Sequence, residues 1–181
     1  GYKGEVITNP SELLRKRYLE TIEEENQLVK GLEGLKDLPC ETADKHRVHL
    51  WVNTGLMADV MQSLDQGAEG IGLFRTEVPF LLSERFPSEQ EQSVIYREQL
   101  EAFAPKVVTM RTLDIGGDKS LPYFPIEEAN PFLGWRGIRV TLDHPEIFTA
   151  QIRAMLRASV GLENLQIMLP RISNVNEVNS A

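Results

Sequence analysis

Four short apolar runs, separated by stretches with helical periodicity, most constrain what this chain can fold into. The runs are VHLWVN, GIGLFRTE, KVVTMRTLDIGG and LQIMLPRI, and each of them ends in polar residues. Apolar segments that alternate with helical segments predict a parallel sheet, because the crossover helices bury both faces of its strands. We therefore expect an α/β fold that contains four successive βα units.

The helices between these runs carry their own start signals. Ser88 and Glu91 have the spacing of a capping box, and so do Asp143 and Glu146. A shorter helix over residues 57–64 should connect the first two strands. These signals place a helix in each of the three connections of the predicted sheet.

A long polar helix is expected before the βα series, with Asn9 as its N-cap, Pro10 at its first position and Glu12 in a capping-box arrangement. Its apolar residues form a narrow stripe at helical spacing, made of Leu14, Tyr18, Ile22, Val29 and Leu32. Such a stripe suits packing along another segment, which favours a connector. A solvated helix with a coincidental stripe is the alternative.

The chain divides on this basis into residues 1–46, which include the polar helix, and residues 47–181, which hold the four βα units. A closed (β/α)8 barrel has eight such units in about 250 residues. The second region is therefore either a small open α/β sheet or half of a larger fold.

Composition excludes several classes of protein. The formal net charge of -8 argues against nucleic-acid binding, which relies on clustered lysine and arginine. A single cysteine, Cys40, excludes an internal disulfide framework and suits a reducing compartment. Because there is no apolar run of transmembrane length and no signal-peptide pattern at the start, we expect a soluble cytoplasmic protein without membrane contact.

Two arginines directly follow apolar runs. Arg75 follows GIGLF and Arg111 follows VVTM, so that parallel pairing would bring both guanidinium groups to the same edge of the sheet, where α/β proteins bind ligands. Two adjacent cations near a core repel each other unless anions neutralise them. Glu77, Asp114 and Asp118 are candidate fixed partners, and a phosphate group would also suit paired guanidinium groups. Internal ion pairs without any ligand remain the alternative.

Longer motifs around these arginines closely resemble the phosphoenolpyruvate (PEP)-binding domain of enzyme I of the bacterial phosphotransferase system. They are GAEGIGLFRTE (67–77), RTLDIGGDKSLPY (111–123), NPFLGWRGIR (130–139) and RAMLRAS (153–159). The stretch RTEVPFLLSERFPSEQEQ looks more like the nitrogen-related branch of that family. The resemblance implies that residues 1–46 are the end of a swivelling domain with a helical linker, and that residues 47–181 are the N-terminal half of a PEP-binding (β/α)8 TIM barrel.

The resemblance also implies a reaction. In that family the barrel binds PEP with Mg²⁺, and a histidine on the mobile domain takes the phosphoryl group and passes it to a small histidine-containing phosphocarrier protein. Arg75 and Arg111 match the arginines that bind the phosphate of PEP, and Arg136 is expected near the pocket, with an ion pair at a helix start as the alternative. The Mg²⁺ ligands and the phosphorylated histidine of the family have no match here, so this fragment is predicted to be inactive alone.

Three histidines and one further arginine are weaker candidates for the site. We expect His49 to be a packed core side chain, His46 to lie in a loop and His144 to lie in the first turn of a helix, where capping would explain it. Arg171 stands where the family usually has an apolar residue. The favoured interpretation of Arg171 is a harmless solvent-facing substitution, and an extra cation at the site is the alternative.

The expected parent protein is thus a PEP-protein phosphotransferase, with a nitrogen-regulatory role. A pyruvate phosphate dikinase or PEP synthase, which uses a related barrel, and a non-catalytic signalling module are the alternatives. Because a half barrel leaves its first and fourth strands as open edges, we also expect a homodimer.

Overall fold

A parallel four-stranded sheet forms the centre of the fold. The computed structural model describes residues 4, 6–117, 119–130 and 132–181, and of residues 57–59 only the backbone. The strands β1 (Val52–Thr54), β2 (Ile71–Arg75), β3 (Val108–Arg111) and β4 (Leu165–Met168) are paired in the order β1-β2-β3-β4, and all three pairings are parallel. The predicted α/β fold with four parallel strands is confirmed, and it is compatible with part of an α/β barrel.

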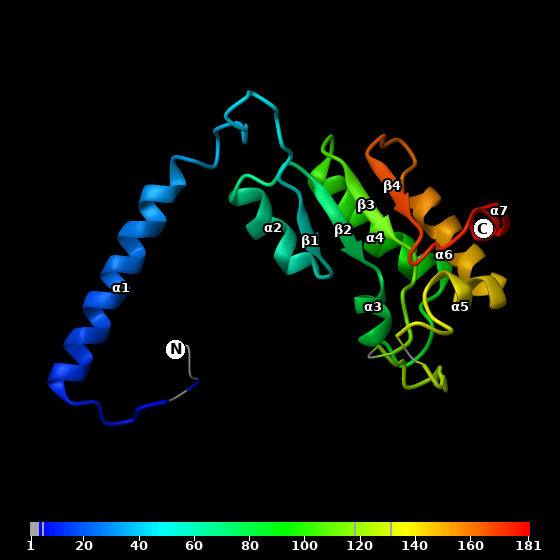
Figure 1. The fold of residues 1–181 in the computed structure, drawn as a ribbon, viewed down its shortest axis with the longest axis horizontal. Helices are drawn as coiled ribbons and strands as arrows, with labels where there is room; N and C mark the ends of the chain where they lie inside the picture. The colour runs from blue at the N-terminus through cyan, green and yellow to red at the C-terminus, as the bar shows by residue number, and fades with distance from the viewer. Residues whose placement is uncertain (1–3, 5, 118, 131) are drawn as a thin grey trace.

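Helices fill every connection between the strands (Figure 1). The first connection contains α2 (Met57–Asp65), the second contains α3 (Glu77–Leu81) and α4 (Glu89–Phe103), and the third contains α5 (Ile138–Asp143) and α6 (Pro145–Ala158). A short helix, α7 (Val175–Ser180), follows β4. The helix α4 packs against both α2 and α6, so these three helices form one layer along the sheet.

Two apolar clusters support the sheet. The larger one lies between the sheet and the helix layer and includes Ile71, Phe74, Leu100, Met110 and Met155, all fully buried. Burying one such side chain stabilises a fold by about 1.5–3 kcal/mol. The smaller cluster lies beside the long β3–α5 connection and includes Phe80, Leu113, Ile115, Leu121 and Val140. It fixes the segment that follows the carboxyl end of β3.

A buried glutamine ties the helix layer to the carboxyl ends of the strands. The Gln151 side chain accepts a hydrogen bond from the Leu113 backbone N–H at 2.8 Å and donates to the hydroxyl groups of Thr76 at 3.1 Å and Tyr96 at 3.0 Å. The Thr76 hydroxyl in turn donates to the Arg111 carbonyl oxygen at 2.7 Å. Burial raises the pKa of Tyr96 above its ordinary value, so the phenol stays protonated as a hydrogen-bonding group. The ends of β2 and β3 are therefore held together by side chains of α4 and α6.

Of the two capping boxes predicted for the helices between the strands, one is present. The Ser88 hydroxyl accepts from the Glu91 N–H, and the Glu91 carboxylate accepts from the Ser88 N–H, at the start of α4. Hydrogen bonds from the Arg85 guanidinium, and then from Ser88, lower the pKa of Glu91 to about 2. The local sequence signal for this helix is confirmed.

The second predicted box, at Asp143 and Glu146, is wrong. The helix α5 ends at Asp143, and α6 begins at Pro145 with His144 as its N-cap residue and no side-chain capping bond. The Asp143 carboxylate instead accepts from the Trp135 indole N–H at 2.5 Å, and the His144 ring packs edge-on against Phe124. The Asp143 carboxylate is therefore occupied by its hydrogen bond with Trp135 and does not cap α6 as the local pattern predicts.

The polar helix α1 (Glu12–Glu33) is present, but its start was misplaced. Ser11 is the N-cap and accepts from the Leu14 N–H, so the prediction of Asn9 is wrong by two residues. No residue of α1 is buried, and the helix stands apart from the sheet (Figure 1). Its apolar stripe is therefore uncovered, and its role as a connector stays a prediction.

The prediction that His49 belongs to the core is also wrong. Its side chain is 59% exposed and lies 3.5 Å from the Glu69 carboxylate. The strand β1 begins only at Val52, so the alternation of polar and apolar residues before it does not form part of the sheet.

Among the described residues, no helix is long and apolar enough to cross a membrane.

Candidate functional site

The two arginines predicted at the strand ends lie side by side. Arg75 is the last residue of β2, Arg111 is the last residue of β3, and the two are directly paired in the parallel register. Sequence spacing alone suggested this neighbourhood, and the sheet confirms it. The environments of the two side chains nevertheless differ.

Two carboxylates hold the Arg111 guanidinium. Its side chain is 15% exposed, its Nη2 donates to Glu77 Oε1 at 2.6 Å, and its Nη1 lies 3.2 Å from Asp114 Oδ2. Its Nε is buried and has no hydrogen-bond partner among the described residues. Arg111 is therefore fixed in position before any ligand arrives.

Glu77, the first residue of α3, serves two cations with one oxygen. Its Oε1 accepts from Arg111 and, at 2.6 Å, from the Lys119 ammonium group, whereas its buried Oε2 has no partner in the described structure. An ionised carboxylate can stay buried when such close cations compensate for the loss of hydration. Glu77 thus links α3 to the loop after β3.

Asp114 faces three guanidinium groups. Besides Arg111, its Oδ1 lies 3.2 Å from Arg136 Nε and 3.5 Å from Arg171 Nε. Arg136 is buried and immediately precedes Gly137, the N-cap of α5. Both interpretations of Arg136 are therefore compatible with its position, because it forms an ion pair at a helix start and lies next to the carboxylate that holds Arg111.

Arg171 faces solvent, as the favoured interpretation expects, and it also contacts the network. Its side chain is 42% exposed, shares Asp114 with the other arginines and donates from Nη1 to the Phe132 carbonyl oxygen at 3.3 Å. Its backbone has φ +58°, which is uncommon for a residue with a side chain. Spacing could not have indicated this contact, because it depends on the loop that follows β4 folding back over Gly137.

A glycine allows the loop after β3 to come close to Arg136. Gly116 has φ +117°, and a Cβ atom there would lie 3.1 Å from the Cβ and Cγ of Arg136. A side chain at this position would combine backbone strain with a tight contact. The DIGG segment is therefore needed to bring Asp114 and Arg136 together, whether or not its backbone also contacts a ligand.

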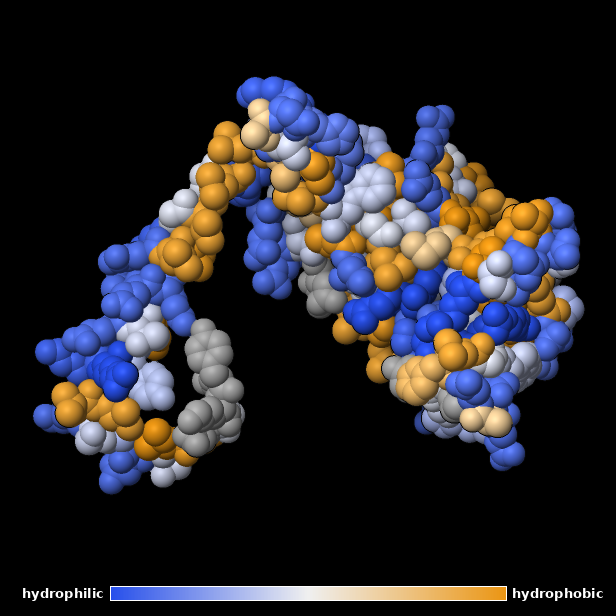
Figure 2. Space-filling view, in the orientation of Figure 1, coloured by the Kyte–Doolittle hydropathy of each residue, from blue (hydrophilic) through white to orange (hydrophobic). Residues whose placement is uncertain are grey.

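Positive charge is in excess at this edge of the sheet. Among the described residues, Glu77 and Asp114 together face four cations, namely Arg111, Lys119, Arg136 and Arg171. Arg75 is exposed and has no hydrogen-bond or ion-pair partner in the described part of the chain. Asp118, the third candidate partner, lies outside the described residues. Figure 2 shows a band of strongly hydrophilic surface near the ends of the strands.

Such an excess in a chain with a formal net charge of -8 favours an anionic ligand. Internal ion pairs explain why Arg111 and Arg136 are held where they are. They leave the unpaired Arg75 and the surplus of cations unexplained. A phosphate group would neutralise several of these charges at once, and its oxygens match the paired donors of a guanidinium group.

The same residues do not suit a metal ion. The described residues contain no group of three or more histidine, cysteine, aspartate or glutamate side chains that could hold one. Glu77 and Asp114 are already bound by arginine and lysine. This set of side chains therefore does not fit the Mg²⁺ that the resemblance implies, and its surplus of cations favours an anion instead.

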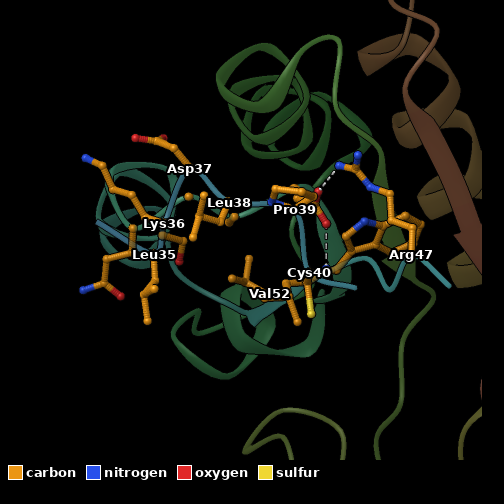
Figure 3. Close-up of a pocket in the computed structure, with 15 residues that line it drawn as sticks. Leu35, Lys36, Asp37, Leu38, Pro39, Cys40, Arg47 and Val52 are labelled. Carbon is orange, nitrogen blue, oxygen red and sulfur yellow. Dashed lines mark hydrogen bonds and ion pairs between the residues drawn. The ribbon is translucent and has the colours of Figure 1, made fainter. Parts of the chain in front are cut away.

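A separate cavity of about 490 Å³ lies at the opposite end of the strands (Figure 3). Its lining includes Leu38, Cys40 and Val52, which surround the hollow in Figure 3, and the ion pair between Arg47 and Glu69. Sequence analysis did not predict this cavity, because its walls come from the segment after α1 and from the starts of β1 and β2. It contains none of the arginines described above.

Comparison with known proteins identifies the family. Residues 29–181 match the model of the PEP-utilising enzyme, PEP-binding domain. The whole chain is 48% identical to a protein of Salmonella typhimurium named phosphoenolpyruvate-dependent phosphotransferase system and 47% identical to the protein of that name from Escherichia coli. It is 46% identical to the phosphoenolpyruvate-protein phosphotransferase of Staphylococcus carnosus. The chain spans 24%, 24% and 32% of the lengths of these three relatives.

The network predicts a large effect of neutralising Glu77. We expect Glu77→Gln to lower the free energy of unfolding by about 2–4 kcal/mol, because Arg111 and Lys119 would lose their shared counter-charge while remaining largely buried. Urea unfolding followed by circular dichroism measures this difference. Glu163→Gln, which changes an exposed glutamate, should stay within about 0.5 kcal/mol of the parent. Equal effects of the two changes would contradict the role given to Glu77.

Proposed function

Because this chain belongs to the PEP-utilising enzymes and matches their PEP-binding domain, we propose that it forms part of a PEP-protein phosphotransferase. In this proposal Arg75 and Arg111 bind the phosphate group of PEP. The observation that carries the proposal is the pairing of these two arginines at the ends of β2 and β3, within an excess of positive charge.

The two arginines have complementary tasks. Arg111 is held by Glu77 and Asp114, so little conformational entropy is lost when it binds an anion. Arg75 has its guanidinium donors available and can close on the phosphate from the neighbouring strand. Fixed cations beside a transferring phosphoryl group stabilise the charge on its equatorial oxygens, which is the main contribution that such an enzyme must make.

The whole protein then carries out the rest of the reaction. It transfers the phosphoryl group to one of its own histidines and on to a small histidine-containing phosphocarrier protein in the cytoplasm. Because the described residues lack a metal-ligand set, we propose that other parts of the whole protein hold the Mg²⁺ and carry that histidine. The fragment should accordingly bind PEP without turning it over.

We further propose that residues 47–181 are the first half of a (β/α)8 TIM barrel and that residues 1–46 contain the linker into it. The chain-order sheet of four parallel strands and the single helix layer support this. A nitrogen-regulatory role is proposed as well. The relatives from Salmonella typhimurium and Escherichia coli are longer than the one from Staphylococcus carnosus, which leaves room for an additional regulatory domain.

Phosphate binding tests the central proposal. In a calorimetric titration with PEP, Arg75→Ala should weaken binding by about 10-fold or more, because a charge-assisted hydrogen bond contributes about 1.5–3 kcal/mol. The thermal unfolding midpoint should not change, since this side chain is exposed and unpaired in the described structure. Arg111→Lys, which keeps the charge but loses the paired donors, should weaken binding as well. The control Arg17→Ala removes an exposed arginine from α1, and an effect equal to that of Arg75→Ala would contradict the proposal.

The fragment should fail to transfer phosphate. Incubated with radiolabelled PEP, Mg²⁺ and a phosphocarrier protein, it should leave the carrier unlabelled, whereas the whole protein should label it. Label on the carrier in the presence of the fragment alone would show that the fragment contains a complete transfer site.

The open sheet edges should make the fragment self-associate. Both β1 and β4 have an unpaired side in the described structure, and three of the four residues of β4 are exposed. We expect light scattering to give a mass above that of one chain, and Ile167→Lys on β4 to lower it, because a charge disfavours edge pairing. Leu156→Lys, on the exposed side of α6, is the matched control. A monomeric parent chain at near-millimolar concentration would contradict this expectation.

A further inference from the structure

Arg171 joins the arginine network from the loop after β4, at the same carboxyl edge of the sheet. It lies three residues after β4, and its Nε is 3.5 Å from the same oxygen, Asp114 Oδ1, that Arg136 contacts at 3.2 Å. Its Nη1 donates to the Phe132 carbonyl oxygen. One carboxylate oxygen therefore lies next to two guanidinium groups from different connections.

The backbone at this point adopts a conformation that needs support. Arg171 has φ +58°, and its Cγ and Cδ lie 3.4–3.5 Å from the position that a Cβ of residue 137 would occupy. Because residue 137 is glycine, the arginine stem packs directly over the start of α5. A left-handed conformation of a non-glycine residue persists only where its surroundings hold it, and such residues are concentrated at functional sites.

Among the described residues, the charge of Arg171 has no negative partner that it does not share with another cation. Asp114 is already faced by Arg111 and Arg136, and Glu77 is shared by Arg111 and Lys119. The contact with Asp114 restrains the Arg171 side chain. It does not cancel the charge of Arg171, because Asp114 already faces Arg111 and Arg136. The effect of Arg171 on this edge of the sheet is thus to add one cation to a site that is already positive.

We propose that Arg171 is a specificity-determining residue, whose charge makes the phosphate site favour dianionic over monoanionic ligands. This inference rests on the proposed function and refines it. The energy of a fixed cation in the field of a ligand scales with the ligand charge, so the preference for a dianion increases with each uncancelled cation nearby. A phosphomonoester such as PEP carries a dianionic phosphate group near neutral pH, whereas a phosphodiester carries one charge.

A purely structural role of Arg171 makes a different prediction. If Arg171 only ties the loop after β4 to Phe132 and Gly137, its loss would distort the site and weaken both classes of ligand by the same factor. If its charge acts on the ligand, the factor for a dianion should be about the square of the factor for a monoanion. The ratio of the two affinities separates the two roles.

The test uses methyl phosphate, a dianion at pH 8, and dimethyl phosphate, a monoanion, titrated into the chain at low salt and followed by phosphorus NMR. We expect Arg171→Met to weaken dimethyl phosphate binding by about 4-fold and methyl phosphate binding by about 16-fold. Arg171→Lys keeps the charge and should retain the parent selectivity. Arg17→Met, which removes an exposed arginine of α1, should leave both affinities unchanged.

The outcomes separate this inference from the proposed function. Equal losses for both ligands in Arg171→Met, or a loss of selectivity in Arg171→Lys, would overturn the role of the Arg171 charge while Arg75→Ala still weakened binding. Unchanged methyl phosphate binding in Arg75→Ala would overturn the proposed site itself. Failure of the parent chain to bind either ligand would overturn both proposals.

Discussion

Two buried carboxylates determine how the carboxyl edge of this sheet is organised. Among the described residues, Glu77 and Asp114 hold four cations, which come from the end of β3, the connection after β3 and the loop after β4. Burying either carboxylate without these cations would cost much free energy, and the cations would repel one another without the acids. Because each carboxylate serves more than one cation, the network is rigid and still carries a net positive charge.

The apolar core makes this network possible by fixing the strand ends. The larger cluster holds the helix layer on the sheet. Gln151, on α6, then fixes the backbone next to the site through its hydrogen bonds with Thr76 and the Leu113 N–H. The smaller cluster fixes the long loop that bears Asp114. Core packing therefore also sets the geometry of the site. Side chains of helices α4 and α6 position the ends of β2 and β3, where the arginines lie.

Local patterns predicted what depends on neighbours in sequence. The four apolar runs gave the four strands, and the Ser88 capping box gave the start of α4, because both signals act over a few residues. Predictions failed where contacts outside the local pattern decided the structure. Asp143 bonds Trp135 instead of capping α6, and His49 lies outside the sheet because pairing begins only at Val52.

The sequence by itself determined which residues stand at the strand ends, because an arginine after each of two consecutive parallel strands must come to the same edge. The tertiary structure alone decided how their charges are shared. It left Arg75 open to solvent, bound Arg111 between two acids, and brought Arg171 to Asp114 across a separation of 57 residues. The physical reason is that ion pairing depends on distances of a few ångströms between segments far apart in the chain, and only packing sets these distances.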